Sequence, residues 1–78
     1  MADSEISITP TTPAEDEYEV ALPDYNRGFV DSLKDNIPVG DRRWDPQGRV
    51  WIVAHAYIEV VEELAHEFFP EAEVNYYG

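Results

Sequence analysis

The 78-residue chain is predicted to form one small α+β domain, in which two helices cover one face of an antiparallel or mixed sheet. Polar and apolar residues alternate over residues 17–22 and 72–77, as in half-buried strands. Apolar residues recur every three or four positions over residues 24–37 and 55–69, as in amphipathic helices. Residues 42–53 hold two aromatic and β-branched runs joined by a turn sequence. The expected order over residues 17–78 is therefore β-α-β-β-α-β.

Residues 1–16 precede this domain and are expected to form a disordered acidic arm. They consist mainly of Ser, Thr, Pro and acidic residues, with little apolar content beyond Ile6 and Ile8. Such a composition cannot bury enough apolar surface to offset the entropy that is lost on ordering. The alternation from Glu5 to Thr9 leaves an alternative open, in which this segment adds to a sheet edge within a complex.

The first strand and the first helix are predicted from residues 17–40. In the strand, Tyr18, Val20 and Leu22 point toward the core, and Pro23 ends it. Asp24 is the expected N-cap of the helix, because its carboxylate can accept from unpaired backbone N–H groups. The buried stripe of this helix comprises Tyr25, Phe29, Val30, Leu33 and Ile37. Its solvent side comprises Arg27, Asp31, Lys34 and Asp35.

A β-hairpin is predicted at residues 42–53, which contain both tryptophans and three of the five basic residues. In the turn Asp45-Pro46-Gln47-Gly48, proline presets φ and glycine accepts the strained exit. If these four residues form the whole loop, Trp44 faces Arg49 and both tryptophans point to one face. If Gly48 forms a bulge, Trp44 faces Val50 and the tryptophans part to opposite faces. We prefer the first register, because burying an aromatic side chain contributes roughly 2 to 3 kcal/mol.

The second helix and the last strand follow the hairpin. Residues 55–69 place the apolar side chains on one stripe, which comprises Tyr57, Ile58, Val61, Leu64, Ala65 and Phe68. The opposite, solvated side comprises Glu59, Glu62, Glu63, His66 and Glu67. Pro70 ends this helix, because proline lacks a backbone donor and crowds the preceding turn. Residues 72–77 alternate again and are expected to form the final strand.

The net charge of −12 is unevenly distributed along the chain. Residues 1–23 carry six acids and no base, residues 24–53 carry five of each, and residues 54–78 carry six acids and no base. A field of this sign repels phosphate backbones and attracts basic protein surfaces. It also favours solubility. We therefore expect a basic protein partner and disfavour nucleic acid as a direct ligand.

The remaining composition bounds the location and the chemistry. The absence of cysteine fits a reducing, cytoplasmic setting, and no signal peptide or apolar run of roughly 20 residues is present. The chain offers no cysteine nucleophile, no glycine-rich phosphate loop and no serine with an evident base nearby. We therefore expect no enzymatic activity, no cofactor and no membrane association.

Three groups of side chains are candidate sites. The open face of the sheet is the expected partner-binding surface and would carry Glu19, Arg43, Val50, Ile52, Glu73 and Tyr77. In the alternative, arginines hold phosphates while indoles stack on bases, at a nucleic-acid site of Arg42, Arg43, Trp44, Arg49 and Trp51. A divalent metal would find suitable residue types on one helix face at His55, Glu59, Glu62 and His66. Two histidines three turns apart cannot reach one ion, so no metal site is expected.

The spacing of several motifs resembles that of a known family. These motifs are Tyr25, Phe29-Val30, Leu33-Lys34, Ile37-Pro38, Arg43-Trp44-Asp45, Arg49, Trp51 and Val53. Together they resemble the HARP domain of annealing helicases and its small free-standing relatives in phages and mobile elements, over about residues 20–69. The resemblance implies a HARP-like α+β domain at residues 17–78. In the helicases this module accompanies a motor and contributes to recognising forked or single-stranded DNA.

Two functions are expected from these observations. The first is a non-enzymatic acidic interaction protein, encoded by a phage or mobile element and active in the cytoplasm of the host. It would bind a basic, nucleic-acid-handling protein and imitate the charge of DNA. The second is a weak module for single-stranded or forked DNA, as the family resemblance implies. This chain has no motor, and three arginines would release few counterions on binding.

Overall fold

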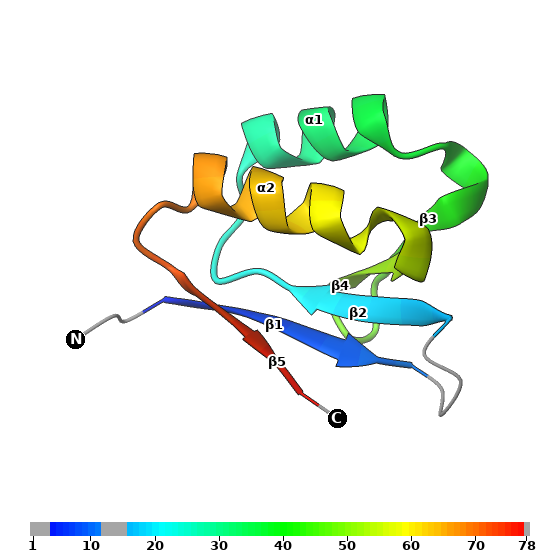
Figure 1. The fold of residues 1–78 in the computed structure, drawn as a ribbon, viewed down its shortest axis with the longest axis horizontal. Coiled ribbons are helices and arrows are strands. Elements are labelled where there is room, and N and C mark those ends of the chain that lie inside the picture. Colours follow the sequence, from blue (N-terminus) through cyan, green and yellow to red (C-terminus); the bar gives the residue numbers. More distant parts are fainter. Residues whose placement is uncertain (1–3, 12–15, 78) are drawn as a thin grey trace.

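A mixed sheet with two helices on one of its faces makes up the protein, as Figure 1 shows. The computed structural model describes residues 4–11 and 16–77. The strands are β1 (Glu5–Pro10), β2 (Glu17–Ala21), β3 (Arg42–Asp45), β4 (Val50–Ala54) and β5 (Glu73–Tyr76). The helices are α1 (Arg27–Asn36) and α2 (Ile58–Phe68), with short 3₁₀ turns η1 (Val39–Asp41) and η2 (His55–Tyr57). The predicted α+β class and the predicted order of elements from residue 17 onward are confirmed.

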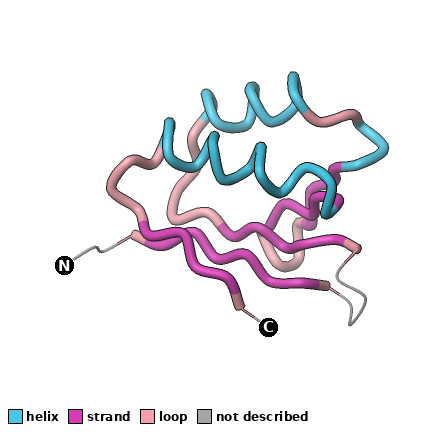
Figure 2. Tube along the Cα trace, in the orientation of Figure 1, coloured by secondary structure: helices cyan, strands magenta, loops and turns pink. Residues whose placement is uncertain are grey.

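The strands lie in the order β3-β4-β2-β1-β5, so β3 and β5 form the two edges. The pairs β3–β4, β4–β2 and β2–β1 are antiparallel, whereas β1 and β5 are parallel. Figure 2 shows the strands as one layer and the helices as a second layer above it. Because the helices cover only one face, the side chains of each strand alternate between a covered and an open face.

Strand β1 corrects the expectation of a disordered arm over residues 1–16. Residues Glu5–Pro10 pair with β2 on one side and with β5 on the other. Ile6 and Ile8 are fully buried beneath the helices. Two buried isoleucines and a backbone that is paired on both sides offset the entropy lost on ordering. Residues 1–3 and 12–15 of the predicted arm lie outside the described residues.

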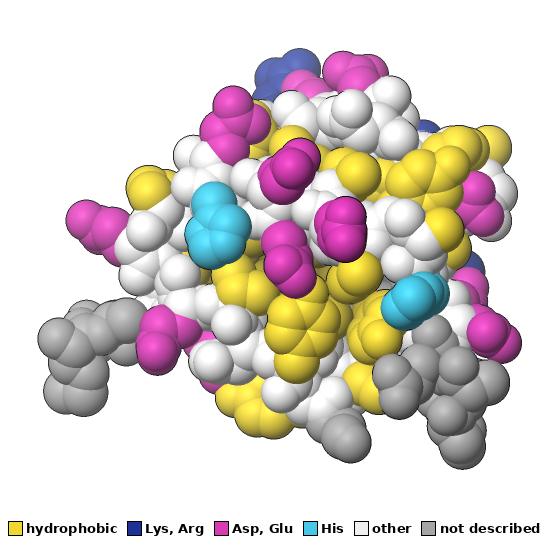
Figure 3. All heavy atoms as spheres, viewed as in Figure 1, with side chains coloured by type: hydrophobic (Ala, Val, Ile, Leu, Met, Phe, Trp, Pro, Cys, Tyr) yellow, Lys and Arg dark blue, Asp and Glu magenta, His cyan; other side chains and the backbone are white. Residues whose placement is uncertain are grey.

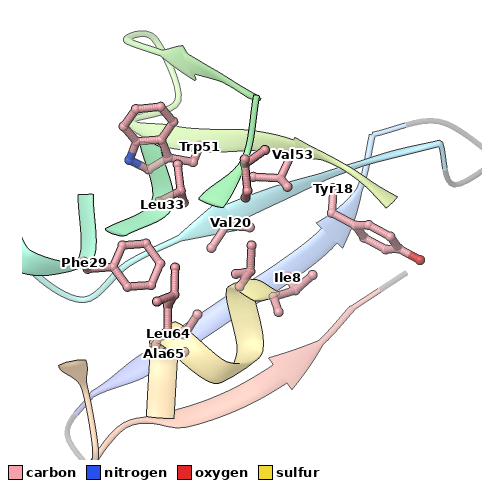
Figure 4. Packing of buried hydrophobic residues seen from close by; sticks show 12 residues of the cluster. Ile8, Tyr18, Val20, Phe29, Leu33, Trp51, Val53, Leu64 and Ala65 are labelled. Carbon is pink, nitrogen blue, oxygen red and sulfur yellow. The ribbon is translucent and has the colours of Figure 1, made fainter. Parts of the chain in front are cut away.

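The hydrophobic core lies between the helices and the covered face of the sheet (Figure 4). The sheet contributes alternate residues of its three inner strands, Ile6, Ile8, Tyr18, Val20, Trp51 and Val53. The helices and their ends contribute Phe29, Leu33, Ile37, Val61, Leu64 and Ala65. The predicted inward positions of β2 and the central positions of both helix stripes are therefore confirmed.

Helix α1 begins later than predicted. Its N-cap is Asn26, whose Oδ1 accepts a hydrogen bond from the Phe29 N–H at 2.9 Å. The Asp24 carboxylate instead accepts from the Tyr25 N–H, in a turn before the helix. Tyr25 consequently lies outside the helix and is 74% exposed, so its predicted place on the buried stripe is wrong.

The hairpin has a register that differs from both predicted ones. Trp44 faces Trp51 and Asp45 faces Val50, so the loop comprises residues 46–49. The strained position is Arg49, with φ of 55°, rather than Gly48. A shift of two residues from the preferred register preserves the side-chain alternation, so both tryptophans still share one face. Trp51 is 8% exposed and belongs to the core, whereas Trp44 on the edge strand is 49% exposed.

Candidate functional site

The fold sorts the charges of the chain into two halves. Residues 24–53 form α1, η1, β3 and all of β4 except Ala54, and we call this range the neutral half. The described residues outside this range form β1, β2, η2, α2 and β5, which we call the acidic half. Because β3 and β4 lie at one edge of the sheet, the three strands of the acidic half are adjacent to each other. Residues 1–23 and 54–78 each hold six of the 17 acidic residues and no lysine or arginine.

The helices follow the same division. Helix α1 lies beside the hairpin, where the Arg42 Nε donates to the Ile37 carbonyl oxygen at 2.9 Å. Helix α2 lies beside β5, where the Tyr76 hydroxyl donates to the Glu62 carboxylate. Figure 3 shows acidic side chains projecting from the face that carries α2, with hydrophobic side chains between them. Helix α2 and the β5 edge of the sheet are therefore neighbours within the acidic half.

On α2, exposed glutamates form a line along the helix that we call the acidic stripe: Glu59, Glu63 and Glu67. Residues four apart lie on one face of a helix, at a rise of about 6 Å per step. Within the described part of the chain, none of the three forms an ion pair. Each like-charge pair at this spacing destabilises a helix by roughly 0.2 to 0.5 kcal/mol. The stripe is therefore an uncompensated negative surface.

The open face of the sheet brings together the predicted partner-binding residues of β3, β4 and β2. Arg43, Ile52 and Glu19 are direct cross-strand neighbours in one row. The Arg43 guanidinium lies 3.3 Å from the Glu17 carboxylate, and Ile52 is only 5% exposed. Val50, which lies two residues before Ile52 in β4, is half-buried. Little apolar surface is therefore exposed on this face.

The other two predicted partner-binding residues, Glu73 and Tyr77, lie at the β5 edge. Glu73 faces Glu5 across the parallel β1–β5 pair. The Glu5 carboxylate accepts hydrogen bonds from the Tyr77 hydroxyl and from Asn75 Nδ2, and these bonds lower the pKa of Glu5. The same hydrogen bond raises the pKa of Tyr77. These contacts connect both ends of β5 to the start of β1.

A groove lies between α1 and the β3–β4 hairpin, on the covered side of the sheet, and apart from Leu22 its lining belongs to the neutral half. Its volume is about 610 Å³. Its lining comprises Leu22, Asp24, Tyr25, Val30, Lys34, Trp44, Arg49 and Trp51. The Trp44 and Trp51 rings meet edge to face, with centroids 5.4 Å apart. The sequence had not suggested that Tyr25 and Lys34 would meet the hairpin at one site.

The predicted nucleic-acid site is only partly assembled. Trp44, Arg49 and Trp51 line the groove together. The Arg42 Nε is directed to a backbone carbonyl, and Arg43 lies on the opposite face of the sheet, where it pairs with Glu17. Two of the three arginines are thus engaged within the protein rather than at the groove.

The helix face considered for a metal has other contacts. Within residues 4–11 and 16–77, no three His, Asp or Glu side chains are placed to hold a metal ion. Glu62 accepts a hydrogen bond from Tyr76, and the centroid of the His55 ring lies 5.6 Å from that of the Tyr18 ring.

A search of the described residues for a membrane-spanning helix finds none with the length and hydropathy that a span requires.

Comparisons of the chain with protein-family models, with curated proteins and with solved structures find no match. The resemblance to HARP domains therefore stays a prediction from the sequence motifs.

Proposed function

We propose that the protein is a non-enzymatic interaction module, whose acidic half binds a basic, nucleic-acid-handling protein. The observation that carries the proposal is the division of charge across the fold. The acidic segments on either side of residues 24–53 become neighbours through the β1–β5 pairing. A surface of one sign on one half of a small protein directs the approach of a partner of opposite charge.

The acidic stripe supports this proposal further. Its carboxylates follow one another at about 6 Å along a rigid helix, so they present a regular row of negative charges as a phosphate backbone does. The repulsion within the stripe lowers the stability of α2, and no described cation relieves it. A basic partner would relieve it on binding. Such a partner would then have its nucleic-acid surface occupied by this protein.

Direct binding of nucleic acid has less support. A polyanion is repelled by the net charge of −12, at distances up to a screening length of about 8 Å at physiological salt. The Arg43 side chain, which the alternative would use, is paired with Glu17. We therefore place nucleic acid on the partner rather than on this chain.

A pull-down with two matched variants tests the proposal. The variant Glu59→Lys/Glu63→Lys reverses two exposed charges on α2, and the control Asp31→Lys/Asp35→Lys reverses two on α1 at the same spacing. Both variants change the net charge equally. We expect the wild type and the control, immobilised on resin, to retain basic nucleic-acid-binding proteins from nuclease-treated bacterial extract. Raising the salt should release them, and the α2 variant should not retain them.

Two outcomes would contradict the proposal. The first is equal retention by the two variants, which would show that only net charge matters and not its place on α2. The second is the recovery of no basic nucleic-acid-binding protein at low salt. Circular dichroism of each variant confirms that the helices are intact before the comparison is made.

A further inference from the structure

The groove between α1 and the hairpin collects the exposed aromatic rings of the neutral half. Tyr25 is 74% exposed and Trp44 is 49% exposed, and both line it. The other exposed tyrosines of the described chain, Tyr76 and Tyr77, donate their hydroxyls to Glu62 and Glu5. Tyr25 and Trp44 are thus the exposed tyrosine and tryptophan rings that have no side-chain hydrogen bond in the described chain. They remain available to a ligand.

The same groove also collects the unpaired cations. Arg27 pairs with Asp31, Arg43 pairs with Glu17, and the Arg42 Nε donates to a backbone carbonyl. Lys34 and Arg49 make no such contact among the described residues, and both line the groove. Asp24 also lines it, but its carboxylate already accepts from the Tyr25 N–H at 2.8 Å. The groove thus holds two cations that are not engaged by a described residue and one carboxylate that already accepts a hydrogen bond, so it favours the binding of an anionic group.

The position of Arg49 is a second indication. Its φ of 55° lies in the left-handed region, which glycine adopts with less strain. The neighbouring Gly48 is not the residue that adopts this conformation. An arginine at the strained position extends a long cationic side chain to the groove, which a glycine could not supply. Strained backbone of this kind is concentrated at ligand-binding sites.

We propose that this groove binds a peptide segment in which a bulky apolar side chain lies next to carboxylates. The apolar side chain would pack against Tyr25, Trp44 and Val30, and the carboxylates would pair with Lys34 and Arg49. A volume of about 610 Å³ is within the range of ligand sites, about 300 to 1,000 Å³. The proposal is independent of the acidic half, and it makes the protein a connector between a basic surface and an acidic peptide.

A peptide suits the groove better than a nucleic acid does. Leu22, Val30 and Trp51 give the lining an apolar character, which satisfies an aliphatic or aromatic side chain but leaves the polar edges of a base unpaired. Two cations neutralise few phosphates, whereas the rest of the chain repels a polyanion. Burial of one large apolar side chain stabilises a complex without any such repulsion.

The test uses NMR spectra of the ¹⁵N-labelled full chain and two capped peptides. The first is Gly-Glu-Phe-Leu-Glu-Gly, and the second replaces both glutamates with lysine. We expect the glutamate peptide at millimolar concentration to shift the Trp44 indole N–H and the Tyr25 and Arg49 amides. The negative net charge of the protein attracts the lysine peptide at long range. Tighter binding of the glutamate peptide at these signals would therefore arise from the charges in the groove itself.

Matched variants locate the charge that matters. Lys34→Glu/Arg49→Glu should weaken the binding of the glutamate peptide by about tenfold or more. Arg27→Glu/Arg43→Glu makes the same change of charge on α1 and β3 outside the groove, and it should leave that affinity unchanged. Four results would overturn the proposal. Two concern the peptides: no shift of the groove signals by the glutamate peptide, or equal affinity of the lysine peptide at those signals. The other two are an equal loss of affinity for the glutamate peptide in both variants, and tighter binding of oligothymidylate at the groove signals. The last result would make the groove a nucleic-acid site.

Discussion

Trp44 lies directly opposite Trp51 across the β3–β4 ladder, with the two ring planes inclined at 60°. The two indoles are nevertheless in different environments, since Trp51 is 8% exposed and Trp44 is 49% exposed. The difference arises because β4 lies under the helices whereas β3 is an edge strand beside the groove. One ring therefore stabilises the core, and the other is available at the surface.

The emission of single-tryptophan variants should show this difference. Trp44→Phe leaves only Trp51, and we expect blue-shifted emission that acrylamide quenches poorly. Trp51→Phe leaves only Trp44, and we expect red-shifted emission that acrylamide quenches readily. Acrylamide is neutral, so the negative charge of the protein does not bias the comparison. Two equally quenched indoles would contradict the described position of the hairpin.

Strand β1 should be essential for stability. Ile8→Val should lower the free energy of unfolding by about 0.5 to 1.5 kcal/mol, and Ile8→Ala by about 2 to 5 kcal/mol, because both leave a cavity in the core. Ser7→Ala changes the neighbouring residue, which lies on the open face. This variant should alter the free energy of unfolding by no more than about 0.5 kcal/mol. Urea unfolding measures all three. Unchanged urea midpoints for the Ile8 variants would contradict the position of residues 5–10 as a strand of the sheet.

The start of α1 distinguishes two capping residues. Asn26→Ala should lower the free energy of unfolding by about 0.5 to 2 kcal/mol, because the Phe29 N–H loses its acceptor. Asp24→Ala should have a smaller effect, since it removes only an exposed turn contact. Hydrogen exchange at the Phe29 amide gives a local measurement beside urea unfolding. Faster exchange of the Phe29 amide in the Asp24 variant than in the Asn26 variant would indicate that Asp24 is the N-cap, as the sequence predicts.

The hydrogen bond between Tyr77 and Glu5 should make stability depend on pH. Because the pKa of Glu5 is lowered in the fold, its contribution is present above the ordinary carboxylate pKa of about 4.3. It is lost as the pH falls through the lowered value. Because the pKa of Tyr77 is raised, its contribution is present below about pH 10 and is lost as the pH rises through the raised value.

Tyr77→Phe tests this pH dependence. The variant should have a lower urea midpoint than the wild type at neutral pH, and the two midpoints should converge in acid. NMR titration of the Glu5 carboxyl carbon should show its pKa return toward the ordinary value in the variant. Asn75 still donates to Glu5 in this variant, so the return should be partial. An unchanged Glu5 pKa would show that the Tyr77 contact is not formed in solution.

Much of the fold could be predicted because its signals are local. The alternation in β2, the stripe of Phe29 and Leu33 in α1, and the stripe of Val61 and Leu64 in α2 each lie within a few residues. The place of β1 could not be predicted in this way. One of its two partner strands, β5, is more than 60 residues away, and each of these two short strands gains its hydrogen bonds along this edge only when the other is present.

The candidate site was predicted less well, because it depends on the edge of the sheet. The prediction that both tryptophans share a face was correct, but the expected burial of both is wrong for Trp44, because β3 is an edge strand of the sheet. The hairpin register depended on whether Gly48 or Arg49 takes the left-handed conformation, and local preference favoured glycine. Tyr25 fits the spacing of the α1 stripe, yet the cap at Asn26 places it one turn too early to be buried.

The decisive measurement is a competition for the basic protein that the wild-type resin retains. That protein is first bound to a fluorescently labelled DNA duplex, and this protein is then added while the anisotropy of the duplex is followed. We predict that the wild type and Asp31→Lys/Asp35→Lys displace the duplex at similar concentrations, whereas Glu59→Lys/Glu63→Lys needs about tenfold more or fails. Displacement that is equal for both variants, or a complex in which the partner holds the duplex and this protein together, would contradict the proposed role of the acidic half.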